Sequence, residues 1–82
     1  MMRARVTITL KQGVLDPQGK AIEGALAGLG FGGVHSARQG KVIDLELEGD
    51  DAETARADVE KMCEALLANT VVERYHIAIL DQ

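Results

Sequence analysis

The side chains in this sequence that could carry chemistry begin with one thiol and two imidazoles. A nucleophilic cysteine must be ionised and needs a base beside it. Cys63 falls on the apolar stripe of a predicted helix, where a buried and unreactive thiol is expected. His35 and His76 fall in predicted strands, and two histidines without further ligands make a poor metal site. We therefore predict no catalytic residue and no metal ligand in this chain.

Three carboxylates alternate along another predicted strand. Paired carboxylates can serve acid–base catalysis. Here they alternate with apolar residues, which places them together on the face of the strand that meets solvent. We interpret them as a solvated face; they are Asp44, Glu46 and Glu48.

A glycine-rich stretch at residues 28–33 invites comparison with a phosphate-binding loop. It follows the C-terminal end of a predicted helix, which is the negative end of the helix dipole, whereas anions bind at the N-terminal end. We interpret it as the helix exit, with Gly30 in a left-handed cap. The same helix begins with Asp16 as N-cap and Pro17 at its first position, and a carboxylate there repels phosphate. Since no Walker-type loop is present either, we expect no cofactor to bind this chain.

The elements that must position these residues follow from hydrophobic periodicity. Period-two alternation and β-branched runs predict strands, and apolar residues three and four apart predict helices. Gln39-Gly40 predicts a tight hairpin turn between two strands, and Asp50 with Glu53 predicts the start of the second helix. The predicted strands are residues 4–10, 34–38, 43–48 and 71–80, and the predicted helices are 17–29 and 52–66.

The predicted order is therefore β-α-β-β-α-β, an α+β chain. This order is typical of a ferredoxin-like two-layer sandwich, in which an antiparallel sheet carries two helices on one face. The 82 residues predict a single domain, 1–82. Because 46% of the residues are hydrophobic in so small a chain, we expect part of the apolar surface to be buried against a second copy, in a homo-oligomer.

Charge and composition exclude several classes of protein. With a net charge of −4, the chain lacks the basic surface of a nucleic-acid binder. An RNA-recognition sheet would also need aromatic side chains that stack on bases, and the chain has almost none. No apolar run approaches the ~20 residues of a membrane span, and no signal-peptide pattern is present. A single cysteine fits a reducing, cytoplasmic location.

Several blocks of the sequence resemble the PurS family. Residues 11–19, Lys-Gln-Gly-Val-Leu-Asp-Pro-Gln-Gly, resemble its N-terminal block, and Arg38-Gln39-Gly40-Lys41 resembles its R-x-G-K motif. Residues 25–34, 62–69 and 71–75 resemble the remaining blocks, in order and at family spacing. One departure is Thr70, where the family usually has proline.

The resemblance implies a non-catalytic subunit of phosphoribosylformylglycinamidine (FGAM) synthase, a glutamine-dependent ligase of purine biosynthesis. It implies a PurL-like large subunit that uses ATP and magnesium, and a PurQ-like glutaminase that releases ammonia. By the same resemblance, the small subunit is expected to form a dimer or a tetramer, to join these two partners and to assist ammonia transfer. Seven residues are predicted to contact partners, six from the resembling blocks and Lys20 from its place near the start of the first helix: Lys11, Gln18, Lys20, Arg38, Lys41, Glu73 and Tyr75.

Two readings remain open from the residues alone. Tyr75 fits a contact within the homo-oligomer as well as a contact with a partner subunit, since a buried tyrosine hydroxyl needs a hydrogen-bonding partner in either case. An ACT-like regulatory module, which binds a small ligand at a dimer interface, has the same order of elements, and fold alone does not exclude it.

Overall fold

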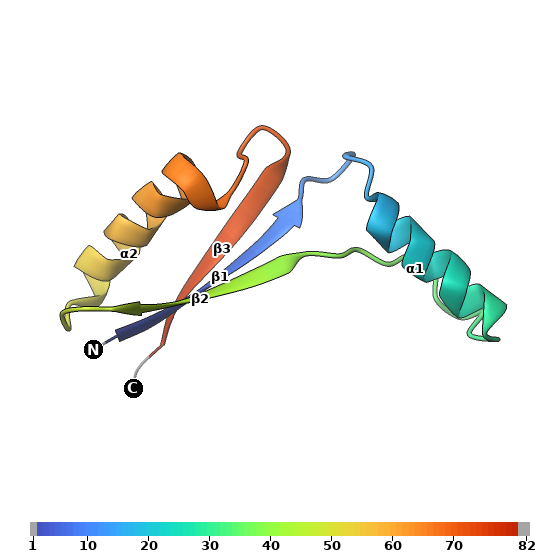
Figure 1. Cartoon of the computed structure of the whole chain (residues 1–82), viewed down its shortest axis with the longest axis horizontal. Helices are drawn as coiled ribbons and strands as arrows, with labels where there is room; N and C mark the ends of the chain where they lie inside the picture. The colour runs from blue at the N-terminus through green and yellow to red at the C-terminus, as the bar shows by residue number, and fades with distance from the viewer. Residues whose placement is uncertain (1, 81–82) are drawn as a thin grey trace.

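The computed structural model describes residues 2–80, which form an elongated molecule with an antiparallel sheet at one end and a helix at the other (Figure 1). The elements are β1 (Met2–Leu10), α1 (Pro17–Gly28), β2 (Lys41–Leu47), α2 (Ala52–Met62), a π-helical turn η1 (Cys63–Leu67) and β3 (Glu73–Leu80). The three strands lie in the order β2-β1-β3, and both pairs are antiparallel. The predicted α+β class with an antiparallel sheet is confirmed.

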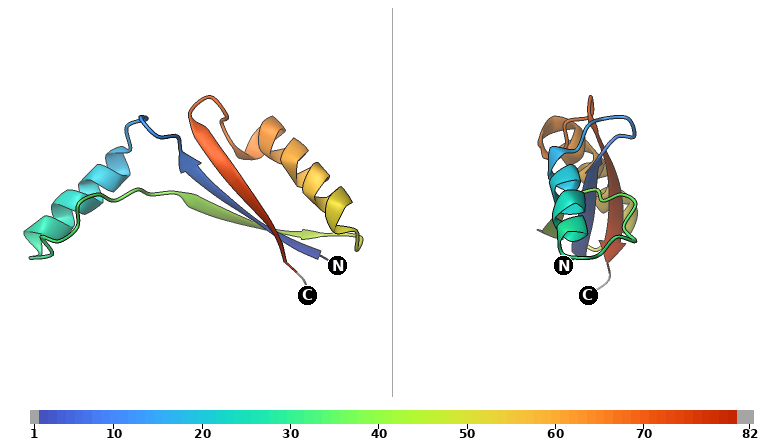
Figure 2. Two further views of the ribbon diagram at one scale, coloured as in Figure 1. Left: turned by 180° about the vertical axis from the view of Figure 1, so that it is seen from behind. Right: turned by 90° about the vertical axis from the view of Figure 1, so that its right-hand side faces the viewer.

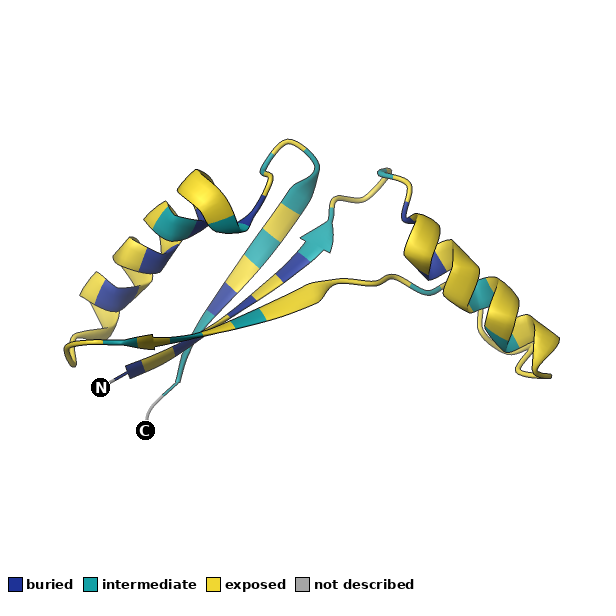
Figure 3. Cartoon of the chain, in the orientation of Figure 1, coloured by how far each residue is buried: buried dark blue, intermediate teal, exposed yellow. Residues whose placement is uncertain are grey.

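The sheet places its apolar residues on one face because side chains alternate along each strand. On β1, Ala4, Val6 and Ile8 are buried while the intervening residues are exposed. Helix α2 packs over β1 and β3 on this inner face and adds Val59 to the core, and η1 adds Cys63; both side chains are fully buried. Figure 3 shows the buried positions of α2 on the side that faces the strands. The core therefore lies in the sheet and α2 alone.

The prediction of two helices on one face of the sheet is wrong for α1. This helix lies beyond the end of the strands (Figure 2), and Gly19 is its only buried residue. The chain turns back along the helix after it ends, so α1 and the return segment form an arm, residues 17–37. The radius of gyration is 16.1 Å, whereas a compact chain of this length has a radius of about 12 Å.

The predicted strand at residues 34–38, which holds His35, is absent, and so is the hairpin turn at Gln39-Gly40. A strand needs a neighbouring edge with which to exchange hydrogen bonds, and in the arm no strand is within reach. Side chains of α1 and its cap serve instead, since Glu23 accepts a hydrogen bond from the amide of Ala37 at 2.8 Å. The segment therefore runs along the helix as irregular chain.

The ends of both helices follow local sequence rules. Helix α1 starts at Asp16 with Pro17 in its first turn, as predicted, and Gly30 has a φ of +98°. The amide of Phe31 donates to the carbonyl of Leu26, which closes a Schellman motif at the exit. The second helix is capped one residue later than predicted, by Asp51, which accepts a hydrogen bond from the amide of Glu53.

The turn before β3 forms with Thr70, the position at which the sequence departs from the family that it resembles. The side-chain oxygen of Asn69 accepts from the amide of Val71 at 3.2 Å, and its backbone oxygen accepts from the amides of Val72 and Glu73. The turn is therefore built on Asn69 and does not need a proline at the next position.

Because α2 and the sheet contribute most of the core, truncation of one buried side chain there should lower the free energy of unfolding markedly. We predict that Val59→Ala lowers the free energy of unfolding by about 2 kcal/mol, from lost burial and the cavity left behind. The control is Val71→Ala, because Val71 is 80% exposed; its effect should stay within about 0.5 kcal/mol. Urea denaturation at equal chain concentration measures both, and equal effects would contradict this location of the core.

Candidate functional site at the junction of sheet and arm

Two chain segments connect the arm to the sheet, residues 11–16 on the way out and residues 38–40 on the way back. The contacts between these two segments form a junction. We define the junction by Asp16, Arg38, Gln39, Gly40, Lys41 and Glu73. Two of the blocks that carry the family resemblance, residues 11–19 and 38–41, meet here although the whole of α1 lies between them in the chain. The junction is therefore our candidate site, because residues from two separate resembling blocks come into contact there.

The Asp16 carboxylate joins these two segments. One oxygen accepts a hydrogen bond from the amide of Gly19 at 2.9 Å, which caps α1, and the other accepts from the amide of Gln39 at 2.7 Å. Asp16 is buried, so both bonds are shielded from competing water. Hydrogen bonds from Gln39 and then Gly19, which favour the ionised form, lower the pKa of the Asp16 carboxyl below its ordinary value.

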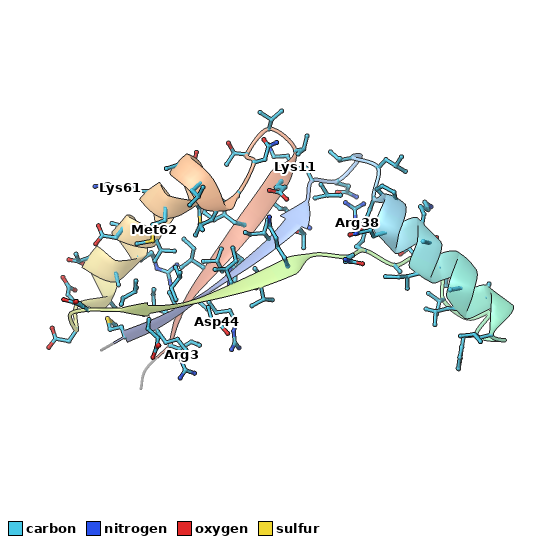
Figure 4. The ribbon with its side chains drawn as sticks, viewed as in Figure 1. Arg3, Lys11, Arg38, Asp44, Lys61 and Met62 are labelled. Atoms are coloured by element: carbon cyan, nitrogen blue, oxygen red, sulfur yellow. The ribbon has the colours of Figure 1, made fainter. Side chains whose placement is uncertain are left out.

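Arg38 closes the junction from the other side. Its guanidinium Nη2 donates to the carbonyl oxygens of Leu10 at 3.0 Å and Lys11 at 3.1 Å, at the end of β1. Figure 4 shows Arg38 beside the start of α1, with Lys11 at the end of the sheet. Arg38 thus ties the returning chain to the strand that the arm left.

Two glycines allow the chain segments to approach closely. A Cβ on Gly19 would overlap the carbonyl oxygen of Ala37, and one on Gly40 would come within 2.6 Å of the carbonyl oxygen of Ile8. Real Cβ atoms do not approach a backbone oxygen so closely, so neither position tolerates a side chain without a shift of backbone. The sequence analysis interpreted these residues only as part of a helix start and a turn.

A cavity of about 460 Å³ opens between the end of the sheet and the start of α1. Ile8 and Leu10 give it an apolar wall, and Gln18, Lys41 and Glu73 stand at its polar side. Lys41 Nζ lies 3.9 Å from Glu73 Oε2, and the other oxygen of Glu73 accepts from the amide of Asn69.

Of the seven predicted contact residues, the structure places Arg38, Lys41 and Glu73 in the junction. Lys11 and Gln18 lie beside it, since the Lys11 carbonyl accepts from Arg38 and Gln18 lines the cavity. Lys20 lies farther along α1 and pairs with Glu23 at 3.6 Å. Tyr75 lies on β3 toward α2, where its hydroxyl donates to Glu64 at 2.9 Å. That hydrogen bond, together with burial, raises the pKa of Tyr75 to about 12. Contact of any of these residues with a partner stays a prediction.

Asp16 is the junction residue that sequence reasoning missed as a site, because it explained the carboxylate fully as a helix cap. The second hydrogen bond, to Gln39, joins residues 23 apart and leaves no periodic signal. The only available signal was that both ends of this bond lie in blocks that resemble one family.

The side chains that could take part in catalysis, the thiol, a histidine and the carboxylates of β2, lie away from the junction and are poorly placed for catalysis. Cys63 is fully buried in the core, and burial raises the pKa of its thiol, so the thiolate is disfavoured. His76 lies on the outer face of the sheet, opposite the core. Asp44 also lies there, in an ion pair with Arg5 at 2.8 Å. Within residues 2–80, no group of three histidine, cysteine or carboxylate side chains is placed to hold a metal ion.

Among the described residues, no helix combines the length and the apolar character needed to cross a bilayer.

Comparison with known proteins gives one consistent result. The family model "PurS: Phosphoribosylformylglycinamidine (FGAM) synthase" matches residues 3–81. Phosphoribosylformylglycinamidine synthase subunit PurS of Methanocaldococcus jannaschii is 44% identical over 79 residues, which cover 96% of this chain and 95% of that protein.

Two solved structures have the same fold. A crystal structure of Methanocaldococcus jannaschii PurS, one of the subunits of formylglycinamide ribonucleotide amidotransferase, superposes with a TM-score of 0.92 at 41% identity and covers 100% of this chain and 99% of that one. A chain in the structure of PurLQS from Thermotoga maritima gives a TM-score of 0.88 at 37% identity, with 96% of each chain covered.

The two glycines provide a matched test of the junction. We predict that Gly19→Ala weakens the packing of the return segment on α1, because its methyl group meets the Ala37 carbonyl, and that hydrogen exchange at the Gln39 amide becomes at least tenfold faster. Gly24→Ala is the control, since a Cβ there meets no atom within 4 Å, and alanine favours a helix by about 1 kcal/mol over glycine. Faster exchange at Gln39 in both variants would argue against close packing at Gly19.

The lowered pKa of Asp16 predicts a pH dependence of the junction. A carboxyl whose pKa is lower in the folded state stabilises that state when ionised, and the contribution is lost as pH falls from the ordinary aspartate value, about 4, through the lower folded value. Protection of the Gln39 amide, corrected for intrinsic exchange, should therefore decline over this acidic range. In Asp16→Asn, protection should be lower at neutral pH and should not change across the same range; an equal decline in the variant would assign the effect to another carboxylate.

Proposed function

The chain belongs to the PurS family of phosphoribosylformylglycinamidine synthase subunits, and we propose that it serves that synthase as a non-catalytic connecting subunit. The synthase converts formylglycinamide ribonucleotide, glutamine and ATP to formylglycinamidine ribonucleotide, glutamate, ADP and phosphate. The observation that carries the proposal is family membership across residues 3–81. Placement of the single thiol inside the core supports the non-catalytic part, since glutamine hydrolysis needs an accessible thiolate with a base beside it.

The partners in this proposal are a PurL-like large subunit and a PurQ-like glutaminase. The similar chain from Thermotoga maritima occurs in a structure of PurLQS, which supports the same association here. The large subunit would use ATP and magnesium, and this chain would bind no cofactor. Its location would be cytoplasmic, and residues 1–82 would act as one PurS-like domain, without contact to nucleic acid or membrane.

The mechanism would be binding and enclosure. Ammonia released by the glutaminase escapes or is protonated if it meets bulk water, so a path closed by protein contacts preserves it. The junction presents a cavity with an apolar wall and a polar side to the partners. Lys11, Gln18, Lys41 and Glu73 are our candidates for contacts there, because their side chains are not required by the Asp16 hydrogen bonds that hold the arm.

The chain would also associate with itself, as a dimer or a tetramer. Its elongated shape supports this. Its exposed large apolar side chains support it too, because apolar surface of this kind marks sites of protein association. The alternative function, an ACT-like ligand-binding module, gains no support from the matched proteins, which are PurS subunits.

We predict that purified large and glutaminase subunits make formylglycinamidine ribonucleotide from glutamine only when this chain is added, with at least a tenfold gain. When ammonium chloride at high concentration replaces glutamine, addition of the chain should matter little, because transfer between subunits is no longer needed. Product formation measured with both nitrogen sources tests the proposal.

Cys63→Ala is the control for a non-catalytic role. Its added chain should restore glutamine-dependent activity as well as the unchanged chain, provided that circular dichroism confirms folding. Glutamine-dependent activity that is equally high without the chain would contradict the connecting role, and loss of activity in a folded Cys63→Ala chain would contradict the claim that Cys63 is structural.

A further inference from the structure

Strand β3 has one edge that no strand of residues 2–80 covers. The sheet order β2-β1-β3 places it at the end of the sheet, next to α2 (Figure 1). All 8 residues of β3 pair with β1 in an unbroken register, so no bulge bends the edge away, and the strand contains no proline. Proteins usually protect such an edge, because its unpaired amides and carbonyls bind other strands. An unprotected edge of this length therefore indicates a binding surface.

The hydrogen bonds around β3 show which backbone groups point to this free edge. The carbonyl of Val72 accepts from the amide of Lys11 at 2.8 Å, on the side of β1. The amide of Glu73 donates at 2.7 Å on the opposite side, to the turn before the strand. Successive residues of an antiparallel strand direct their amide and carbonyl to alternate sides. The amide and carbonyl of Tyr75 and of Ile77 therefore point to the free edge.

One side chain of α2 already uses part of this edge. Nη1 of Arg56 donates to the carbonyl of Ile77 at 3.1 Å. Toward the start of the strand, the amide and carbonyl of Tyr75 face no strand of the described chain. The part of the edge that is free to bind is therefore residues 73–77.

An open groove of about 590 Å³ lies beside this part of the edge, between β3 and the helical segment formed by α2 and η1. Figure 4 shows the Lys61 side chain extended away from the strands. Two carboxylates, those of Glu60 and Glu64, therefore determine the charge of the groove beside Tyr75, whose hydroxyl donates to Glu64. The groove is lined by Ala57, Glu60, Lys61, Glu64, Ala65 and Tyr75.

We propose that residues 73–77 and this groove bind an extended segment of another protein that carries a lysine or an arginine. The segment adds to the sheet as one more strand, and its backbone pairs with the free groups of Tyr75. Every second side chain of the added strand lies on the face of the sheet that carries α2. A basic side chain there packs its aliphatic part against Ala57 and the Tyr75 ring, and its charge pairs with Glu60 and Glu64.

Charge favours such a segment over a second copy of this chain as the occupant. Glu60 and Glu64 are four residues apart on one helix, where like charges repel each other. A cation between them removes that repulsion, whereas a second β3 edge would bring two more carboxylates to the groove. Within the proposed function the segment belongs to a larger synthase subunit, so the inference rests on that function for the identity of the partner.

Hydrogen exchange tests the added strand, with single residues resolved by electron-transfer fragmentation and mass spectrometry. In the chain alone, the amide of Tyr75 should exchange at least tenfold faster than that of His76, which faces β1. In the synthase assembled from this chain, the large subunit and the glutaminase, the Tyr75 amide should exchange at least tenfold more slowly than in the chain alone.

Two results of this measurement would overturn the proposal. A Tyr75 amide that is already protected in the chain alone would show that the chain or a second copy covers the edge. A Tyr75 amide that stays fast in the assembled synthase would show that no partner strand binds there, and it would leave the connecting role intact. Failure of the three proteins to assemble at all would contradict the connecting role as well.

Glu60→Lys tests the charge of the groove. Glu60 forms no hydrogen bond or ion pair with any other residue in the described part of the chain, so the variant should fold, as circular dichroism would confirm. We expect assembly to weaken at least tenfold and protection of Tyr75 to be lost. Asp58→Lys is the matched control, because Asp58 is exposed on the same helix, about 200° around from Glu60. Equal effects of the two variants, or no effect of Glu60→Lys, would overturn recognition of a basic segment.

Photo-cross-linking identifies the segment itself. Benzoylphenylalanine in place of Ala57 should attach, in the assembled synthase, to a partner peptide with a lysine or arginine within three residues of the attachment point. The control places it at Ala52, which is exposed and about 140° around α2 from Ala57, and should give at least tenfold less of that product. Attachment to a second copy of the chain, or to a partner peptide without a basic residue, would overturn the proposal.

Discussion

The structure depends on one carboxylate that serves two segments at once. Asp16 caps α1 and also accepts a hydrogen bond from the amide of Gln39, so one carboxylate joins the chain that leaves the sheet to the chain that returns to it. Without the second bond, α1 would remain capped, but the direction of the arm relative to the strands would depend on Arg38 alone. A buried ionised group is stable only when hydrogen bonds replace its water, and the two amides supply them. The arm therefore has a defined direction although it has almost no packing against the sheet.

Elements with their own periodic signal could be predicted from the sequence. Strand β1, helix α2 and the exit of α1 at Gly30 follow from alternation, from the apolar stripe and from a glycine that takes positive φ. The placement of α1 could not be predicted in the same way. An apolar stripe indicates that one face of a helix packs against another surface, but it does not indicate which surface that is. The missing strand at 34–38 has the same cause. Local sequence favours an extended segment, and the edge that would pair with it lies out of reach within one chain.

The candidate site shows a similar division. Motif resemblance selected Arg38 and Lys41 and, separately, Lys11 and Gln18, and the structure places them at one junction. Resemblance could not assign a role to each residue, because it does not distinguish a side chain that builds the junction from one that is left over for a partner. Geometry makes that distinction. The guanidinium of Arg38 donates hydrogen bonds to two backbone carbonyls of its own chain, whereas Gln18 lines an open cavity.

The core of this chain is small, between one helix and three strands, and it encloses the single thiol. The feature that distinguishes the chain is its shape. An arm fixed at one carboxylate extends the molecule to 48 Å along its longest axis, farther than a compact chain of equal mass would reach. Such a reach lets a small subunit present its sheet and its arm to two larger proteins at once. The arm adds surface for association without adding to the core, because the core lies between the sheet and the second helical segment.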